Sequence, residues 1–128
     1  MSATRDVALN ELPIRGMSIN ATDSSTNAFT LVPSDSGIIF INKDATATTY
    51  TLPAVASAAG KMFWFYNQGA AGMAITAPSG TLVALNNAAA TTATFSTSAH
   101  MIGAAAMVVC DGTSYFFFNL SLETATIS

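Results

Sequence analysis

The sequence predicts an all-β protein: an antiparallel β-sandwich of jelly-roll type with an extended N-terminal arm. Beyond residue 27, short runs of β-branched and aromatic residues alternate with turn signals built from Pro, Gly, Asn, Asp and Ser. These runs recur roughly every 8 to 12 residues, the spacing typical of sandwich strands. The chain has 128 residues, the length of one domain with a substantial core.

The first part of the chain differs in composition from the rest. The apolar residues around Pro13 lack helical spacing, and residues 20–27 (NATDSSTN) have the composition of a loop. We therefore expect an arm and linker over residues 1–27 and a β-sandwich domain over residues 28–128. No internal repeat at solenoid period is evident.

Turn signals divide the expected domain into candidate strands. These are residues 28–32, 37–42, 48–52, 61–67, 73–77, 81–85, 92–96, 105–110 and 114–120. Asp111-Gly112 is the strongest hairpin signal, because Asp-Gly accommodates the positive φ angles of a tight turn. Residues 54–61 are rich in alanine and reach Gly60, which favours no more than a turn of helix. The small side chains of residues 86–100 are compatible with a surface strand or with a loop.

Charged residues are scarce and unevenly placed. The chain has four basic and seven acidic residues, a net charge of −3, and none of either sign between Lys61 and Asp111. A negative net charge argues against a nucleic-acid partner. No apolar run approaches the roughly 18 residues of a membrane helix, and the N-terminus lacks the apolar core of a signal peptide. We expect a soluble protein, made in a cytoplasm, with no membrane partner. The charge-free stretch is typical of a surface that faces protein, although a surface of Ser, Thr, Asn and Gly would look similar.

The residues that are able to carry chemistry have simpler structural interpretations. His100 is the only histidine, and it lies near a predicted strand. Cys110 is the only cysteine, which excludes an internal disulfide, and it ends an apolar strand, where it acts as a small hydrophobe. Asp35, Asp44 and Asp111 lie in predicted turns, where Asp bonds its own backbone. We therefore predict no enzyme activity, no metal and no cofactor.

Two predicted strands, 61–67 and 114–120, are apolar on both faces. Side chains alternate between the two faces of a strand. One set can therefore fill the core, and the other set has to be buried against another layer. A monomer that exposed such large rings would risk aggregation. We expect a second protein layer from an obligate oligomer, with cover inside the monomer, or a platform that stacks sugars, as alternatives. The residues predicted for the subunit interface are Met62, Trp64, Tyr66, Phe116 and Phe118.

Several motifs occur in a characteristic order along residues 34–118. They are the strand led by Gly37, Thr51-Leu52-Pro53, AAGKMFWFYNQG (58–69), MAITAPSG (73–80) and Cys110-Asp111-Gly112-Thr113 before the last long strand. Together they resemble a module found in virion proteins of tailed bacteriophages. Such modules occur in capsid decoration (cement) proteins, head fibres, and tail fibre or spike domains. The resemblance implies a β-sandwich that is typically trimeric.

The size of the chain, a module with a short arm, favours a decoration protein within this group. The resemblance then implies a structural protein that binds the outside of an assembled phage capsid and stabilises it. Its partners would be its own copies in a homotrimer and the major capsid protein, and its location would be the virion surface. The residues expected to form the capsid-binding arm are Arg5, Leu9, Leu12, Ile14 and Arg15. The alternative is a head-fibre, tail-fibre or spike domain that binds a host-surface glycan.

Overall fold

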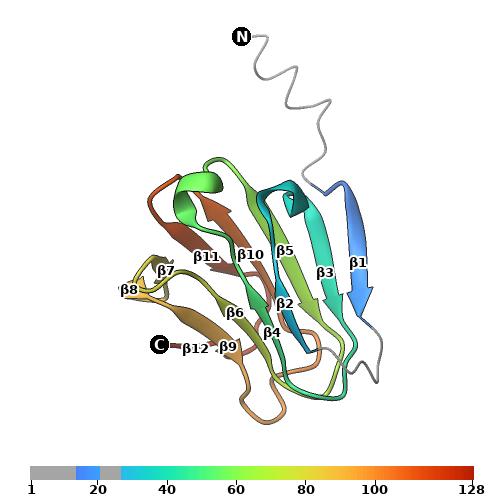
Figure 1. Ribbon diagram of the computed structural model, residues 1–128. Helices are drawn as coiled ribbons and strands as arrows, with labels where there is room; N and C mark the ends of the chain where they lie inside the picture. The colour runs from blue at the N-terminus through green and yellow to red at the C-terminus, as the bar shows by residue number, and fades with distance from the viewer. Residues whose placement is uncertain (1–13, 21–26) are drawn as a thin grey trace, which may run out of the picture.

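The structure, a computed structural model, describes residues 14–20 and 27–128. Its strands form a seven-stranded and a five-stranded sheet that pack face to face (Figure 1). The strands are β1 (Gly16–Asn20), β2 (Ala28–Thr30), β3 (Ile38–Asn42), β4 (Thr48–Thr51), β5 (Met62–Asn67), β6 (Met73–Thr76), β7 (Leu82–Ala84), β8 (Asn87–Ala90), β9 (Thr92–Phe95), β10 (Ala105–Cys110), β11 (Tyr115–Asn119) and β12 (Thr126–Ile127). Every strand predicted from the sequence is present, and the prediction of an all-β sandwich is confirmed. The strands β1, β8 and β12 were not among those predicted.

Both sheets are mixed, so the prediction of antiparallel sheets was wrong. The larger sheet has the order β1-β3-β5-β10-β11-β7-β8, and the smaller has the order β12-β9-β6-β4-β2. Neighbours run parallel from β1 to β3 to β5, from β2 to β4 to β6, and from β7 to β11. These strands are parallel because of the connections between them. From β1 to β6 the chain crosses to the other sheet after every strand. Each sheet therefore receives its next strand in the same direction.

This winding corresponds to a weak internal repeat that the sequence analysis missed. Asn20, Asn42 and Asn67 align on the neighbouring parallel strands β1, β3 and β5. In the other sheet, Thr30, Thr51 and Thr76 align in the same way. Each of these threonines is followed within three residues by a proline: Pro33, Pro53 and Pro78. Only these single positions recur, and the number of residues between them varies, so no fixed period is visible in the sequence.

The core lies between the two sheets and is rich in aromatic rings. Phe40, Tyr50 and Phe65 form one cluster, with ring centroids 5.3 to 5.7 Å apart. Phe63 is fully buried, and the hydroxyl of Tyr115 donates a hydrogen bond to the carbonyl oxygen of Pro53 at 2.8 Å. The inward set of each two-sided strand therefore fills the core, as alternation requires.

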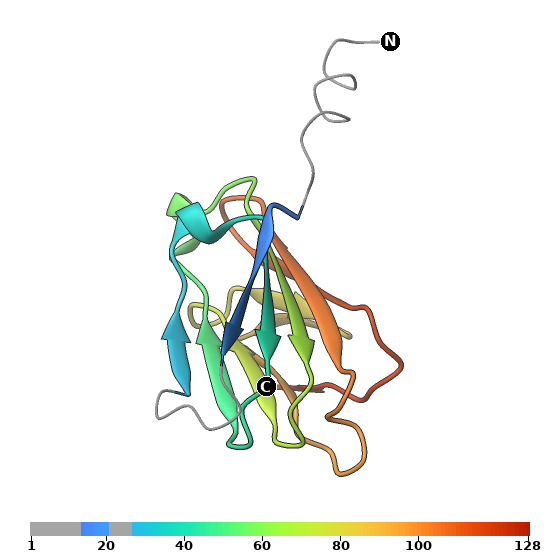
Figure 2. The same cartoon turned by 90° about the vertical axis from the view of Figure 1, so that its right-hand side faces the viewer.

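Short turns close the two ends of the sandwich. The 3-10 helices η1 (Pro33–Asp35) and η2 (Val55–Ser57) lie at the same end (Figure 2). The second of them confirms the predicted turn of helix. Asp111 and Gly112 make the predicted hairpin, with Gly112 at a φ of 95°. The carboxylate of Asp111 accepts hydrogen bonds from the backbone N–H groups of Ser114 and Thr113, which lower its pKa.

Residues 16–20, which the sequence analysis assigned to the arm, pair with β3 as an edge strand of the larger sheet. Arg15 fixes the start of this strand. Its backbone N–H bonds to the carbonyl of Gly37 at 2.7 Å, and its guanidinium bonds to the carbonyls of Ser34 and Ser36. In the part of the chain that the structure describes, no helix is long and apolar enough to cross a membrane.

Candidate functional site

The outer side of the seven-stranded sheet carries apolar side chains on six adjacent strands. We call this surface the apolar face. It consists of Met17, Ile19, Ile39, Ile41, Met62, Trp64, Tyr66, Val83, Ala105, Met107, Val109, Phe116 and Phe118. None of these side chains is charged. All five residues predicted for a subunit interface belong to it, so the structure brings the predicted set together on one surface.

Strand pairing lines up these side chains in rows across the sheet. The central row joins directly paired residues of five neighbouring strands. From β1 to β11 it is Met17, Ile39, Trp64, Met107 and Phe118. Side chains directly opposite each other on paired strands are in contact distance, so the row is continuous. The residues on β1, β3 and β10 were not predicted for the interface, because strand order cannot be read from a sequence without an alignment.

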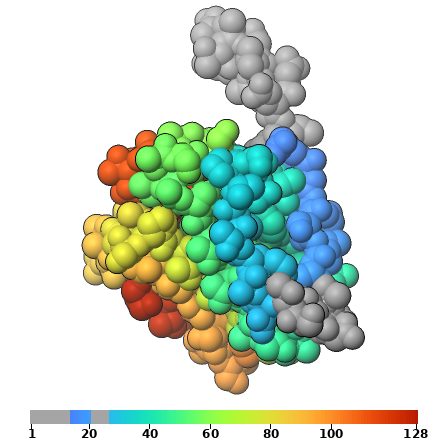
Figure 3. Space-filling model, viewed as in Figure 1, coloured from blue at the N-terminus to red at the C-terminus, as the bar shows by residue number. Residues whose placement is uncertain are grey.

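The other sheet of the same protein provides a direct comparison. Its outer side is the surface facing the reader in Figure 3, and it is lined with threonine. The threonines are Thr30, Thr49, Thr51, Thr76, Thr92, Thr94 and Thr126. Threonine suits a strand and keeps a hydroxyl for water, which is the usual composition of a solvated sheet face. The apolar face does not have this composition, so the two outer faces of the sandwich differ in chemistry.

The dimensions of the apolar face support the same conclusion. From standard spacings, it is about 24 Å across its five central strands and about 20 Å along them, or roughly 500 Å² in outline. The largest apolar patch on an ordinary monomer is about 300–600 Å² and is often functional, so the apolar face is of the size of such a patch. A full sheet face of this kind is therefore a candidate interface in its own right.

Trp64 occupies the centre of the apolar face. Its Nε1 atom is shielded from solvent and has no acceptor among residues 14–20 and 27–128. A buried indole N–H ordinarily finds a hydrogen-bond partner. The ring therefore contributes packing area but leaves one donor unpaired within the described chain.

The two edges of the apolar face differ in shape. At one edge, β1 presents Met17 and Ile19, which are 64% and 51% exposed. Toward the other edge, a hollow of about 410 Å³ lies beside the β7–β8 hairpin, lined by residues 83–88 of the hairpin and residues 116–118 of β11. We call these features the β1 ridge and the hairpin groove. The turn of the hairpin, Leu85-Asn86, has positive φ at both positions.

The residues predicted for a capsid-binding arm are only partly described. Arg5, Leu9 and Leu12 lie outside the described residues. Ile14 is exposed just before β1. Arg15 is also exposed, but its guanidinium is bound to the turn around η1, so it serves to position the strand.

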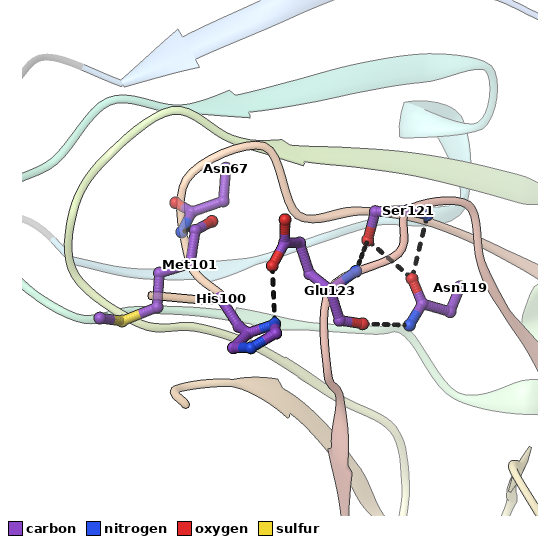
Figure 4. A network of polar contacts seen from close by, with 6 residues as sticks. All are labelled: Asn67, His100, Met101, Asn119, Ser121 and Glu123. Carbon is purple, nitrogen blue, oxygen red and sulfur yellow. Dashed lines mark hydrogen bonds and ion pairs between the residues drawn. The ribbon is translucent and has the colours of Figure 1, made fainter. Parts of the chain in front are cut away.

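His100 takes part in a polar network at one end of the sandwich (Figure 4). Its Nδ1 lies 2.9 Å from Oε2 of Glu123. The side chain of Asn119 bonds to the carbonyl of Glu123 at 2.8 Å and to Ser121, so the network joins two loops. Within residues 14–20 and 27–128, no three His, Cys, Asp or Glu side chains lie close enough together to hold a metal ion.

A second recess lies between the edges of the two sheets. It has a volume of about 390 Å³ and is lined by parts of β1, β2, β3 and β4, with Asp35 at its rim. The rings of Phe29 and Tyr50 stack inside it with centroids 5.5 Å apart. Burial, and secondly the charge of Asp44, raise the pKa of Tyr50 to about 12, so its hydroxyl stays neutral.

The apolar face is the feature that most clearly distinguishes this molecule from a fully solvated β-sandwich. Comparisons of the chain with protein-family models, with curated proteins and with solved structures gave no match.

Proposed function

We propose that this chain is a structural virion protein, a decoration protein that binds the outside of an assembled phage capsid as a homotrimer. The single observation that carries the proposal is the contrast between the two sheet faces. One face is threonine-rich and suited to water, and the other is apolar and uncharged over its whole width. This contrast supports a role in an assembly, and the resemblance of the motifs along residues 34–118 to phage virion modules supports the kind of assembly that we propose.

The position of strand β1 supports separate contacts for the N-terminal segment and for the apolar face. Strand β1 starts at the end of the sandwich where η1 and η2 lie, and the bonds of Arg15 fix its direction there (Figure 2). We therefore assign the chain before Ile14 to a different contact from the one made by the apolar face. In this proposal, the apolar face joins the three copies, and residues 1–13 dock on the major capsid protein.

Stabilisation of the capsid would follow from mass action. A protein that binds the assembled shell, and not its dissociated subunits, shifts the equilibrium toward the shell. At a free concentration of about 100 times the dissociation constant, each occupied site adds about 2.7 kcal/mol. A trimer places three arms around one local three-fold position, which raises the effective concentration of the second and third arms.

The test is co-sedimentation with capsids of the virus that encodes the chain. Deleting residues 1–13 leaves Ile14 and the bonds of Arg15 in place, so we expect an intact trimer that no longer binds capsids. Changing Leu9 and Leu12 to serine should give the same result with a full-length chain. Undiminished capsid occupancy by both variants would refute the docking arm.

A fibre or spike domain that binds a host-surface glycan is the second candidate function. The observation that favours it is the recess lined by the half-buried ring of Phe29 and by Asp35, because an aromatic ring and a nearby carboxylate suit a sugar ring. A glycan array separates the two functions. Binding to a bacterial polysaccharide that disappears in Phe29→Ala, with no capsid binding, would favour the fibre domain.

A further inference from the structure

We propose that neighbouring copies associate edge to edge on the apolar face, with the β1 ridge of one copy packed into the hairpin groove of the next. This inference rests on the proposed oligomer and specifies its contact. The residues that meet are those of the ridge and of the groove, so strand β1 belongs to the interface.

The β1 ridge has little cover among residues 14–20 and 27–128. Strand β1 is the edge of the larger sheet, and Met17 and Ile19 are the most exposed members of the apolar face, whereas Trp64 and Met107 in the centre are partly covered by their neighbours. An apolar edge strand left open is a site for association with another chain. The ridge is therefore the part of the apolar face whose side chains have the most exposed surface to bury against a partner.

The hairpin groove is shaped to receive such a ridge. Phe116 and Phe118 form one wall, and the hairpin with Val83 and Leu85 forms the other. The positive φ angles at Leu85 and Asn86 define a tight turn that holds the hairpin beside β11. Ridge and groove contain no charged side chain, so identical chains with a net charge of −3 meet there without placing like charges in contact.

In this proposal the groove is occupied by the ridge of a second copy, because the ridge of the same copy lies too far away. Three strands, β3, β5 and β10, separate β1 from β11 in the sheet. At the usual strand spacing, this places the ridge about 19 Å from the groove within one copy. A head-to-tail contact between different patches of identical chains is heterologous, and it forms a ring when the rotation between neighbours closes. In a trimer, the three apolar faces would surround the axis, with each ridge seated in the next groove.

Site-directed cross-linking tests this contact directly. Two tagged chains, Met17→Cys and Ala88→Cys, are co-expressed in a Cys110→Ala background and treated with a short bis-maleimide. Ala88 lines the groove and is exposed, so cysteine should be tolerated there. We expect a cross-linked pair that contains both tags, and at least tenfold less product from either variant alone. The matched control pairs Met17→Cys with Thr30→Cys on the threonine-rich face, and it should give no product above background.

The number of chains in the cross-linked products shows how many copies form the closed oligomer. In the double variant Met17→Cys/Ala88→Cys, we expect a ladder that ends at three chains. A ladder that ends at two would support the ridge-to-groove contact and contradict the trimer. Self-cross-linking of Met17→Cys alone, or no mixed product from an oligomer seen by light scattering, would overturn the contact.

A charge substitution provides a second readout that needs no cysteine. Met17→Asp places a carboxylate on the ridge, so we expect a folded monomer by light scattering and circular dichroism. Thr30→Asp, the same change in charge on the other face, should leave the oligomer mass unchanged. An intact oligomer in Met17→Asp would overturn the inference. Capsid co-sedimentation of the unmodified chain tests the decoration role separately, so the two proposals can fail independently.

Discussion

Asn42 and Asn67 lie side by side at the ends of the parallel strands β3 and β5, and Nδ2 of Asn42 donates a hydrogen bond to Oδ1 of Asn67 at 2.8 Å. Asn20 on β1 continues the row, donating to Oδ1 of Asn42 at 2.6 Å. At the other end, Nδ2 of Asn67 bonds to the carbonyls of Ala71 and Met101. This asparagine ladder ties the edge strand β1, which carries the ridge, to the body of the domain.

The ladder predicts a large effect for Asn42→Ala. Asn42 is fully buried, and its loss would leave the donor of Asn20, the acceptor of Asn67 and the backbone N–H of Asp44 without their partner. An unpaired buried polar group costs about 1–3 kcal/mol, so we expect a loss of about 3 kcal/mol or more in the free energy of unfolding. Urea denaturation measures it. Asn20→Ala, at the open end of the ladder, is the control and should lose less. Equal losses would contradict the ladder.

Trp64→Phe should leave the stability of the protein unchanged or raise it by up to about 1 kcal/mol. The substitution removes the unpaired indole donor but keeps an aromatic ring on the apolar face. Trp64→Ala, which loses the ring as well, should destabilise the protein by about 3 kcal/mol. Thermal unfolding at fixed protein concentration measures both. If Trp64→Phe dissociates the oligomer, the indole has an acceptor in a partner copy.

Gly69→Ala should be strongly destabilising. A Cβ at Gly69 would overlap the backbone carbonyl of Asp44, and backbone cannot move aside as a flexible side chain can. We expect a loss of about 2 kcal/mol or more, in the range of overpacking substitutions. Gly16→Ala is the control, because a Cβ there meets only the Ile38 side chain at 3.9 Å. Melting temperatures that fall equally in the two variants would be the contrary result.

Tyr50 should make the protein sensitive to alkali. Its pKa is raised from 10.0 to about 12 in the folded state, so folding favours the neutral phenol. The unfolded chain ionises first, and this contribution to stability is complete below pH 10 and is lost as the pH rises from 10 to 12. Tyr50→Phe should therefore show a shallower fall of unfolding free energy across that window. An identical slope in both proteins, measured by urea denaturation at several pH values, would contradict the prediction.

The local elements of the fold were predictable because their signals are local. Alternating β-branched and aromatic residues identify a strand wherever they occur, and the predicted hairpin turn forms over residues 111–114, with positive φ at Gly112. The strand β1 was missed because its sequence, GMSIN, is short and follows a polar stretch. The pattern Met17-x-Ile19 was the available signal, two apolar side chains on the same face of a strand.

Parallel pairing was not predictable from the same signals. A sequence of short strands separated by turns predicts a series of hairpins, and the strands of a hairpin are antiparallel. Two sets of recurring positions are local traces of the alternative winding: Asn20, Asn42 and Asn67, and the threonines that precede a proline. Neither set can be interpreted until the strands that carry it are known to be neighbours.

By itself, the sequence determined where nine of the twelve described strands lie, where the chain turns between them, and that the strand containing Trp64 has no polar face. Those properties depend on the alternation of side chains along one strand. Only the tertiary structure decided that Met17, Ile39 and Phe118 share a row with Trp64. That row exists because the chain crosses between two sheets after each early strand, and such crossings depend on long-range packing, which no local pattern encodes.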